Sequence, residues 1–329
     1  MEMTYEQYRL MLRDLRRRFS VVGWILLVYF GIMNAAVSVS MFIEMAVKIL
    51  EAVMVGNYGD IWSAASGATD SAWGYFLSSG IGLGILLLWK KRAYWKQEIW
   101  AKGKPMTFGS FLGLLCIFMS GQLLYQLIMT VAEIVLNLFG LSVLQGMQAV
   151  AMDTGNFGMF LYGGILAPVT EEILFRGLIQ RTLMPWGKRF AILGSAFVFG
   201  IFHGNLLQTP YAFVVGLVLG YVACEYSIGW AMVLHMVNNM VLGDTLTRLT
   251  SGLPELAGAQ VIWAILLLCG IGALVTLIVR RKDVKRYRRE NPINRTLVKS
   301  FFSSPGIITL MAVMGVNMVL SLFMMITPV

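Results

Sequence analysis

Two adjacent glutamates and an arginine interrupt one of the most apolar parts of the sequence, the stretch TEEILFRG at 170–177. A charge buried in hydrocarbon is costly, so carboxylates in such a setting usually face an internal cavity or an ion-pair partner. Glu172 and Arg176 are four residues apart, so they share one helical face and can pair with each other. Glu171 is rotated by ~100° from Glu172 around a helix, and the same arginine does not obviously serve it. Glu171 is therefore the first candidate for a chemical role.

The only two histidines of the chain follow soon after this stretch. One is His203 in FVFGIFHGN, four residues after Phe199, and the other is His235 in LHMVNNM, four residues before Asn239. Taken singly, each motif fits a hydrogen bond between packed helices as well as it fits a catalytic role. Together they add two imidazoles and a carboxamide to the carboxylate, and this combination favours catalysis.

Distances along the expected helices bring these polar side chains to a similar depth. Counted from the basic turn at 187–189, Glu171 lies ~25 Å and His203 ~21 Å along the α-helical rise. A carboxylate and one imidazole can hold a water molecule and take its proton. The imidazole of His235 and the amide of Asn239 can donate hydrogen bonds to a developing oxyanion. The residue types therefore predict hydrolysis in a cavity in the cytoplasmic half of the membrane or near its midplane.

The same side chains leave a metal-dependent alternative open. Glu171, His203 and His235 are the ligand types of many hydrolytic zinc sites, although the familiar HExxH arrangement is absent. Asn239, one turn from His235, favours an oxyanion site, because a ligating imidazole would present a bare nitrogen to the metal and lose its donor. We therefore expect catalysis without a cofactor, with zinc held by these three residues as the alternative.

The composition requires that these residues be positioned by membrane helices. The chain has 329 residues, of which 58% are hydrophobic and 13% charged, whereas soluble domains carry about a quarter charged residues. The apolar residues gather into runs close to the ~20 residues that a membrane-spanning helix requires. The candidate spans are 20–43, 73–89, 108–139, 156–183, 190–203, 210–224, 229–246, 260–279 and 306–327. We predict an all-α, polytopic transmembrane helical bundle with about eight or nine membrane spans.

The net charge of +9 is arranged in clusters that all fall on one side of this expected bundle. The clusters are RDLRRRF (13–19), KKRAYWK (90–96), KGK (102–104), KR (188–189) and RRKDVKRYRRENPINR (280–295). The loops on the opposite side hold Glu51, Asp60, Asp70 and Asp153. This positive-inside pattern predicts a cytoplasmic N-terminus. We expect an integral, multi-pass protein of a bacterial plasma membrane, whose basic loops contact anionic lipid and not nucleic acid.

Four parts follow from this pattern. They are a basic N-terminal surface helix (1–19), N-terminal spans (20–155), a helical core that holds the polar motifs (156–245) and C-terminal spans (246–329) with a basic cytoplasmic connector at 280–305. The three cysteines lie in apolar runs without CxxC spacing, which indicates packing residues.

The series Glu171-Glu172-x-x-x-Arg176, Phe199-x-x-x-His203 and His235-x-x-x-Asn239 resembles the motifs of the CPBP family. This family contains type II CAAX prenyl endopeptidases and bacteriocin-processing or self-immunity (Abi) membrane proteins. The resemblance covers about residues 156–245, with every signature position matched in order.

The resemblance implies a role for each matched residue. Glu171 would be the general base, assisted by His203, and His235 with Asn239 would form the oxyanion site. The supporting residues would be Glu172 and Arg176, as an ion pair, and Phe199, as a packing residue. The implied function is an intramembrane endopeptidase of the glutamate type, which cleaves a membrane-embedded or lipidated protein or peptide. The alternative is a non-proteolytic immunity or scaffold protein of the same family.

Overall fold

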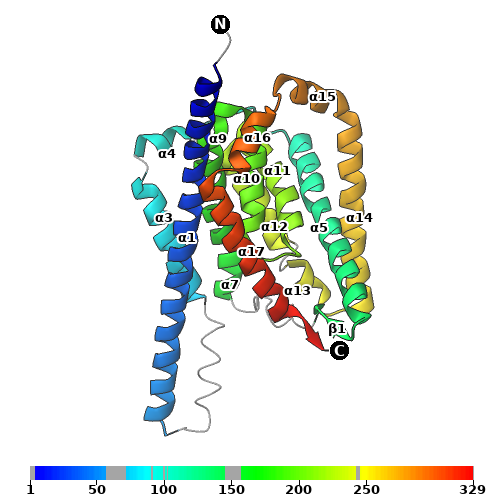
Figure 1. The fold of residues 1–329 in the computed structure, drawn as a ribbon. Coiled ribbons are helices and arrows are strands. Elements are labelled where there is room, and N and C mark those ends of the chain that lie inside the picture. The colour runs from blue at the N-terminus through cyan, green and yellow to red at the C-terminus, as the bar shows by residue number, and fades with distance from the viewer. Residues whose placement is uncertain are drawn as a thin grey trace.

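A computed structural model describes residues 4–56, 72–89, 92–98, 101, 103–144, 157–241 and 245–328 of the chain, and nearly all of them are helical (Figure 1). The N-terminal half contains α1 (Tyr5–Met54), α3 (Trp73–Trp89), α4 (Arg92–Glu98), α5 (Phe108–Asn137) and the short strand β1 (Leu141–Ser142). The C-terminal half contains α10 (Lys188–Phe202), α11 (Thr209–Glu225), α12 (Ile228–Met240), α13 (Leu246–Thr250), α14 (Glu255–Val279), α15 (Arg281–Glu290), α16 (Arg295–Phe302), α17 (Pro305–Met325) and β2 (Thr327–Pro328), which pairs with β1. The all-α class is confirmed.

One long helix, Phe157–Trp186, lies between these halves and carries both glutamates of the TEEILFRG stretch. It consists of α7 (Phe157–Leu161), a π-helical turn η3 (Tyr162–Leu166), α8 (Ala167–Glu172), a second π-helical stretch η4 (Ile173–Gln180), α9 (Arg181–Leu183) and a 3₁₀ turn η5 (Met184–Trp186).

Within the described residues, the predicted apolar runs lie largely on helices. Among the described residues, five helices are long and apolar enough to cross a membrane, and α3 and α11 are apolar but shorter. The five are α1, α5, Phe157–Trp186, α14 and α17. The number of eight or nine spans is therefore not confirmed and stays a prediction.

The basic N-terminal segment differs from the separate surface helix that the sequence suggested. Thr4 and Gln7 form a capping box that starts α1, and the helix then continues without a break for 50 residues into the first apolar run. No proline interrupts it, and both of its internal glycines are tolerated within the helix. The connector at 280–305 instead forms α15 and α16, which lie at the same end of the bundle as the N-terminus (Figure 1).

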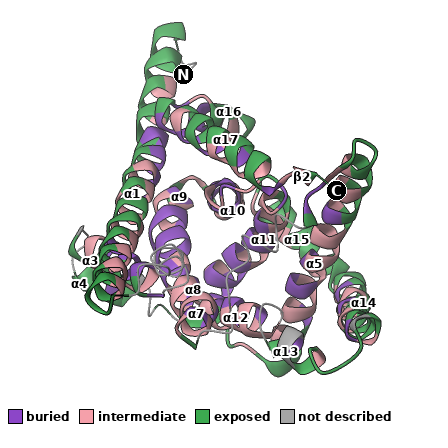
Figure 2. Cartoon of the chain, turned by 90° about the horizontal axis from the view of Figure 1, so that it is seen from below, coloured by how far each residue is buried: buried purple, intermediate pink, exposed green. Residues whose placement is uncertain are grey.

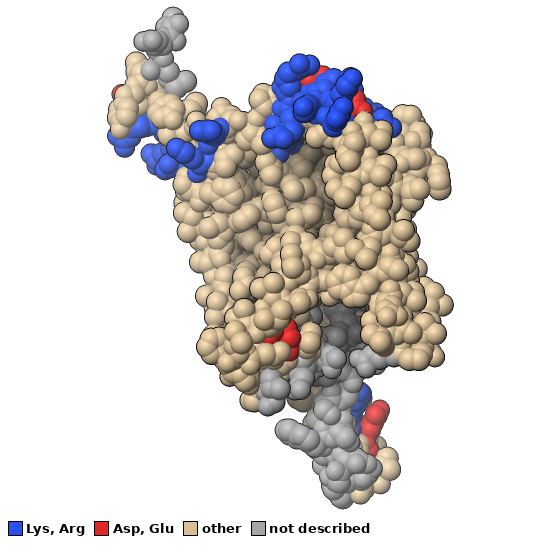
Figure 3. All heavy atoms as spheres, turned by 90° about the vertical axis from the view of Figure 1, so that its right-hand side faces the viewer, with Lys and Arg blue, Asp and Glu red and all other residues tan. Residues whose placement is uncertain are grey.

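Basic side chains gather at that end of the molecule, over α15 and the start of α1 (Figure 3). This matches the one-sided distribution read from the sequence. The orientation relative to the cytoplasm stays a prediction, and Asp60, Asp70 and Asp153 lie outside the described residues.

The buried residues concentrate in the helices nearest to the long central helix. Seen from below, α8, α9, α10, α11 and α12 carry most of the buried positions, whereas α1 and α14 are mostly exposed (Figure 2). Glycines allow the close approach of α10 and α11, because a Cβ at Gly216 would lie 3.2 Å from Ala196. The core that positions the glutamates is thus built from the predicted catalytic segment.

The turn between α10 and α11 satisfies its own backbone. Gly204 adopts a positive φ of 62°, and the side chain of Asn205 accepts hydrogen bonds from the N–H groups of Leu207 and Gln208. The two helices have 15 and 17 residues, fewer than the ~20 needed to cross a bilayer. Non-helical backbone at membrane depth must be satisfied internally, as this turn is. His203 therefore lies where α10 ends, at the turn of a short hairpin formed by α10 and α11.

Candidate active site

The helix that carries Glu171 contains a wide turn that frees one backbone carbonyl. Within Tyr162–Leu166 hydrogen bonds run to the fifth residue back, so the N–H of Ala167 bonds to the first carbonyl of the turn. The carbonyl of Gly163 would take the next such bond from Pro168, which has no N–H. The Nδ2 of Asn239 donates a hydrogen bond to this carbonyl instead, at 3.0 Å. The π turn and the proline thus explain how Asn239 is held against this helix.

Glu172 and Arg176 form the ion pair that their four-residue spacing allows. Nε of Arg176 lies 3.3 Å from Oε2 of Glu172, and neither side chain is exposed. Nη2 of the arginine donates to the carbonyl of Gly216 on α11 at 3.3 Å. The guanidinium carbon also lies 4.3 Å from the ring centroid of Phe199, a cation–π distance. Phe199 therefore contacts the buried charge directly, which its spacing from His203 did not indicate.

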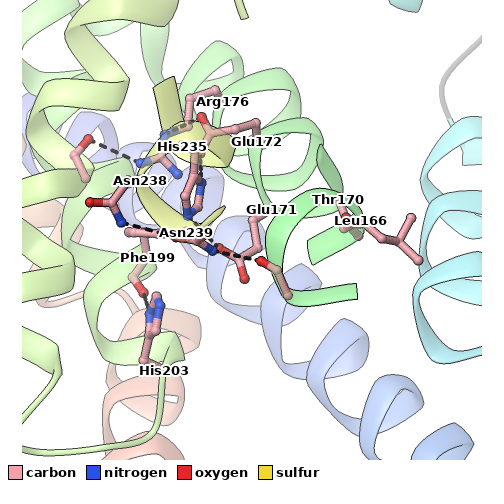
Figure 4. A network of polar contacts seen from close by, with 12 residues as sticks. Leu166, Thr170, Glu171, Glu172, Arg176, Phe199, His203, His235, Asn238 and Asn239 are labelled. Atoms are coloured by element: carbon pink, nitrogen blue, oxygen red, sulfur yellow. Dashed lines mark hydrogen bonds and ion pairs between the residues drawn. The ribbon is translucent and has the colours of Figure 1, made fainter. Parts of the chain in front are cut away.

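His235 lies between the two glutamates (Figure 4). Its Nδ1 is 3.0 Å from Oε1 of Glu172, and its Nε2 is 3.9 Å from Oε2 of Glu171. A carboxylate can only accept, so Nδ1 carries the hydrogen of this bond. Nε2 then offers an N–H to an oxyanion only when the ring is doubly protonated. The sequence had paired His235 with Asn239 and had not indicated its contact with Glu172.

The ring of His203 is oriented by the backbone of its own helix. Its Nδ1 lies 2.9 Å from the carbonyl of Phe199, and a carbonyl can only accept. The neutral ring therefore carries its hydrogen on Nδ1 and leaves Nε2 as a bare acceptor. The Phe199 ring packs edge-on against His203 with centroids 4.8 Å apart, which fixes the imidazole further.

Glu171 and His203 line one cavity of about 360 Å³. The Glu171 side chain is 33% exposed, whereas the neighbouring Glu172 is fully buried. The rest of the wall comes from the long helix, from Phe202 and from α1 and α3, including Tyr29 and Tyr75. Of the four predicted catalytic residues, two thus face the cavity, while His235 contacts Glu171 and Asn239 is bound to the same helix.

A network of hydrogen bonds among buried side chains lies next to Asn239, and the sequence reasoning did not predict it. Asn238 donates through Nδ2 to Oδ1 of Asn239 at 3.2 Å and to the hydroxyl of Tyr211 at 3.3 Å. Gln122 on α5 donates to the same hydroxyl at 2.8 Å. Because the Asn239 oxygen accepts from Asn238, its amide nitrogen is directed toward Gly163. Gln122 and Asn238 are visible in the sequence as polar residues in apolar runs, but no spacing connects them.

Glu171, His203 and His235 are the side chains that would bind zinc in the alternative mechanism. Among the described residues, no group of three or more His, Cys, Asp or Glu side chains is gathered closely enough to hold a metal ion. Glu171, His203 and His235 therefore do not fit a zinc ion as arranged here. The three cysteines are free and partly buried.

These features define a class: a helical membrane protein with a buried glutamate–arginine–histidine cluster behind a cavity that exposes a second glutamate and a second histidine. Residues 153–241 match the model of the type II CAAX prenyl endopeptidase Rce1-like family. All three motifs lie within the matched segment, so the match supports the family that the motifs predicted. No curated protein and no solved structure matches the chain.

The family match and the apolar helices together support an integral membrane protein. At the level of the family, they support an intramembrane endopeptidase of the CAAX type, whose substrate is a membrane-associated protein.

Proposed function

We propose that the protein is an intramembrane endopeptidase in which Glu171 and His203 activate water against a peptide bond. One observation carries the proposal: the side chains of Glu171 and His203 line the same cavity. The bond from Nδ1–H to the carbonyl of Phe199 leaves Nε2 of His203 as an acceptor. A carboxylate and a bare imidazole nitrogen are the groups that can hold a water molecule and remove its proton. The substrate is a peptide or protein segment associated with the membrane, and the protein has its N-terminus in the cytoplasm.

In the proposed reaction Glu171 takes one proton of the water while the water oxygen bonds to the carbonyl carbon. Nε2 of His203 accepts a hydrogen bond from the second O–H of the water and so orients the water for attack. The C–N bond breaks when the proton passes from Glu171 to the leaving amine, which restores the carboxylate. The second hydrogen of the Asn239 amide is available to the oxyanion, because the first is used by Gly163.

The remaining signature residues support Glu171 in this proposal. Glu172 and Arg176 anchor the long helix to α11, and Phe199 packs against the pair. His235 is held by Glu172, and its Nε2 can donate to Glu171 only when the ring is doubly protonated. When doubly protonated, His235 also serves as the second oxyanion donor.

The test is cleavage of a prenylated CAAX-type peptide by protein purified in detergent. Glu171→Gln keeps the shape of the side chain but removes the base, so turnover should fall at least ~10²-fold. Glu290→Gln, on the exposed surface of α15, is the matched control and should cleave as the wild type does. Near-wild-type turnover by a folded Glu171→Gln protein would refute the mechanism.

A proteome-wide comparison of peptide ends in membranes with wild-type or Glu171→Gln protein covers substrates other than CAAX peptides. Ends that depend on Glu171 identify the natural substrate. Identical sets of ends, together with no cleavage of the peptide, would favour the non-proteolytic immunity or scaffold function.

The absence of a metal from the reaction is part of the proposal. Metal content measured by mass spectrometry should be substoichiometric, and cleavage should survive exhaustive chelation. Stoichiometric zinc, with activity lost on removal and restored on re-addition, would make Glu171, His203 and His235 ligands.

A further inference from the structure

The cavity beside Glu171 extends from the middle of the bundle toward one of its ends. Along the long helix its described lining residues run from Tyr162, in the second turn, to Phe175. By the helical rise, Glu171 lies ~21 Å from Phe157 and ~22 Å from Trp186, so it marks the middle of this helix. The lining therefore comes from the half that begins at Phe157 and from the turn that follows Glu171.

That half of the helix lies toward the end of the bundle opposite to the basic clusters. Arg189, which follows the long helix, donates to the carbonyl of Arg288 on α15 at 3.0 Å, so the helix finishes at the basic end. Phe157 lies toward the other end, where α7 is far from α15 (Figure 1). Of α10, which starts at the basic end, the cavity is lined by Phe202, its last residue, together with His203 beyond it.

α3 lines the cavity from the same end. A Cβ at Gly82 would meet Tyr29 of α1, whereas a Cβ at Gly74 would meet Ser40, so α1 and α3 run in opposite directions. α3 therefore begins beside the part of α1 that is far from the basic N-terminus. The lining residues of α3, all within its first two turns, are Tyr75, Ser78 and Ser79. The three elements agree on the direction in which the cavity extends.

Aromatic side chains close the basic half of the bundle beside α1. The ring centroid of Phe19 lies 4.9 Å from that of Trp186, 5.3 Å from that of Phe190 and 5.7 Å from that of Phe301. The three phenylalanines are at most 3% exposed. Phe19 precedes Tyr29 by ~15 Å along α1, so this cluster lies between the cavity and the basic end. Side chains packed in this way leave no passage for a peptide chain.

The second half of the long helix is covered as well. Leu178 and Leu183 are at most 1% exposed, so this stretch is packed into the core. On its other side α4 lies against Gly177, where the hydroxyl of Tyr94 donates to the carbonyl at 2.8 Å and a Cβ would meet the Trp95 ring at 3.3 Å. Neighbouring helices therefore separate Glu171 from the basic end, whereas the cavity lies on its other side.

We propose that the substrate reaches Glu171 from the end of the bundle opposite to the basic clusters. The cleaved segment then belongs to a membrane-associated protein and lies on the other side of the membrane from those clusters. With the predicted cytoplasmic N-terminus, this is the outer side. The inference rests on the proposed endopeptidase function and adds to it the side from which the substrate comes. It also departs from the cavity in the cytoplasmic half that the sequence allowed.

Thiol labelling tests this route without any substrate. In a variant without native cysteines, Ala167→Cys places a thiol in the cavity wall one turn before Glu171. An impermeant reagent should reach it from the same side as Gly252→Cys and not from the side that labels Arg288→Cys, whichever way the protein is inserted. Val28→Cys, 61% exposed and next to a lining residue of α1, is the matched control. It should react from neither side, because it faces hydrocarbon and not the cavity.

Three labelling results would overturn the route. They are reaction of Ala167→Cys from the side of Arg288→Cys, no reaction from either side, and reaction of Val28→Cys at the same rate. The last would show that labelling does not require the cavity.

Cleavage by sealed vesicles tests the route with a substrate. The prenylated CAAX-type peptide is carried on a soluble protein, so that it cannot cross the membrane. Vesicles that expose the side of Gly252→Cys should cleave it in a Glu171-dependent way, and vesicles of the opposite orientation should cleave it only after detergent is added. Cleavage by intact vesicles that expose the side of Arg288→Cys would overturn the route. Labelling of Ala167→Cys as expected, without Glu171-dependent cleavage even in detergent, would keep the route and refute the endopeptidase.

Discussion

Arg176→Ala should destabilise the protein strongly, because it removes the cation of a fully buried cluster. Glu172 would then be left charged, unexposed and paired only with the ring of His235. The substitution also removes the cation–π contact with Phe199 and the hydrogen bond to the carbonyl of Gly216. The contacts with Phe199, Gly216 and His235 connect the long central helix to α10, α11 and α12.

The expected loss in the free energy of unfolding follows from these contacts. Breaking one side of a buried ion pair typically costs ~3–5 kcal/mol. A desolvated cation–π contact contributes up to ~2 kcal/mol, but contacts made by one guanidinium are not additive. We therefore expect a loss of ~3–5 kcal/mol in the free energy of unfolding. At ~2 °C per kcal/mol for a large domain, the melting temperature should fall by ~6–10 °C.

The assay is thermal unfolding of purified protein in detergent, followed through its nine tryptophans. Arg176→Ala should also reduce the yield from membranes. The informative comparison is the double variant Glu172→Gln/Arg176→Met, which removes both charges and keeps an acceptor for Nδ1 of His235. It should be more stable than Arg176→Ala, because no uncompensated charge stays buried.

A different result would show that Arg176 acts in the chemistry. An Arg176→Ala protein that unfolds at the wild-type temperature and does not cleave peptide would refute the structural role. A double variant less stable than Arg176→Ala would refute the assignment of the cost to an unpaired charge.

Two further predictions concern the basic end of the bundle. A hydrogen bond of 2.7 Å to the Glu225 carboxylate raises the pKa of Lys104 above its ordinary 10.5. The stabilisation of the folded state by this bond is therefore complete below pH 10.5, and it is lost as the pH rises through the higher pKa of the folded state. Lys104→Gln should therefore lower the melting temperature slightly at pH 8, and the difference from wild type should shrink above pH 10.5; a growing difference would contradict the assignment. In a variant without native cysteines, Arg288→Cys should react with an impermeant thiol reagent only after the membrane is opened, whereas Gly252→Cys at the opposite end should react in intact cells. The reverse pattern would invert the predicted orientation.

The helices and the buried ion pair could be predicted because both depend on local spacing. Each apolar run became a helix, since backbone groups in a membrane must be satisfied within the segment. Glu172 and Arg176 pair because residues four apart meet on one face of a helix. The convergence of Glu171 and His203 on one cavity agrees with their similar depth, which the helical rise alone provides.

The contacts that orient these groups depend on the tertiary structure and left no local pattern. The acceptor for Asn239 exists only because a π turn and Pro168 together free the carbonyl of Gly163. Tyr29 lies about 140 residues before Glu171, in a span where an aromatic residue is unremarkable. The continuous helix α1 was missed because the change from basic to apolar residues was interpreted as a structural boundary, whereas the backbone needs no break there.

Two neighbouring glutamates have opposite environments, and His235 connects them. Glu172 is fully buried and bound by a cation and an imidazole, so its charge is compensated and its position is fixed. Glu171 is partly exposed to the cavity, and its Oε2 lies 3.9 Å from the far nitrogen of the same imidazole. Because Glu172 sets the orientation of that ring, a change in the ion pair alters the distance between His235 and Glu171 as well as the stability of the bundle. The stability of the bundle and the position of Glu171 therefore both depend on the ring of His235. When the ion pair between Glu172 and Arg176 is weakened, activity should be lost before the protein unfolds globally.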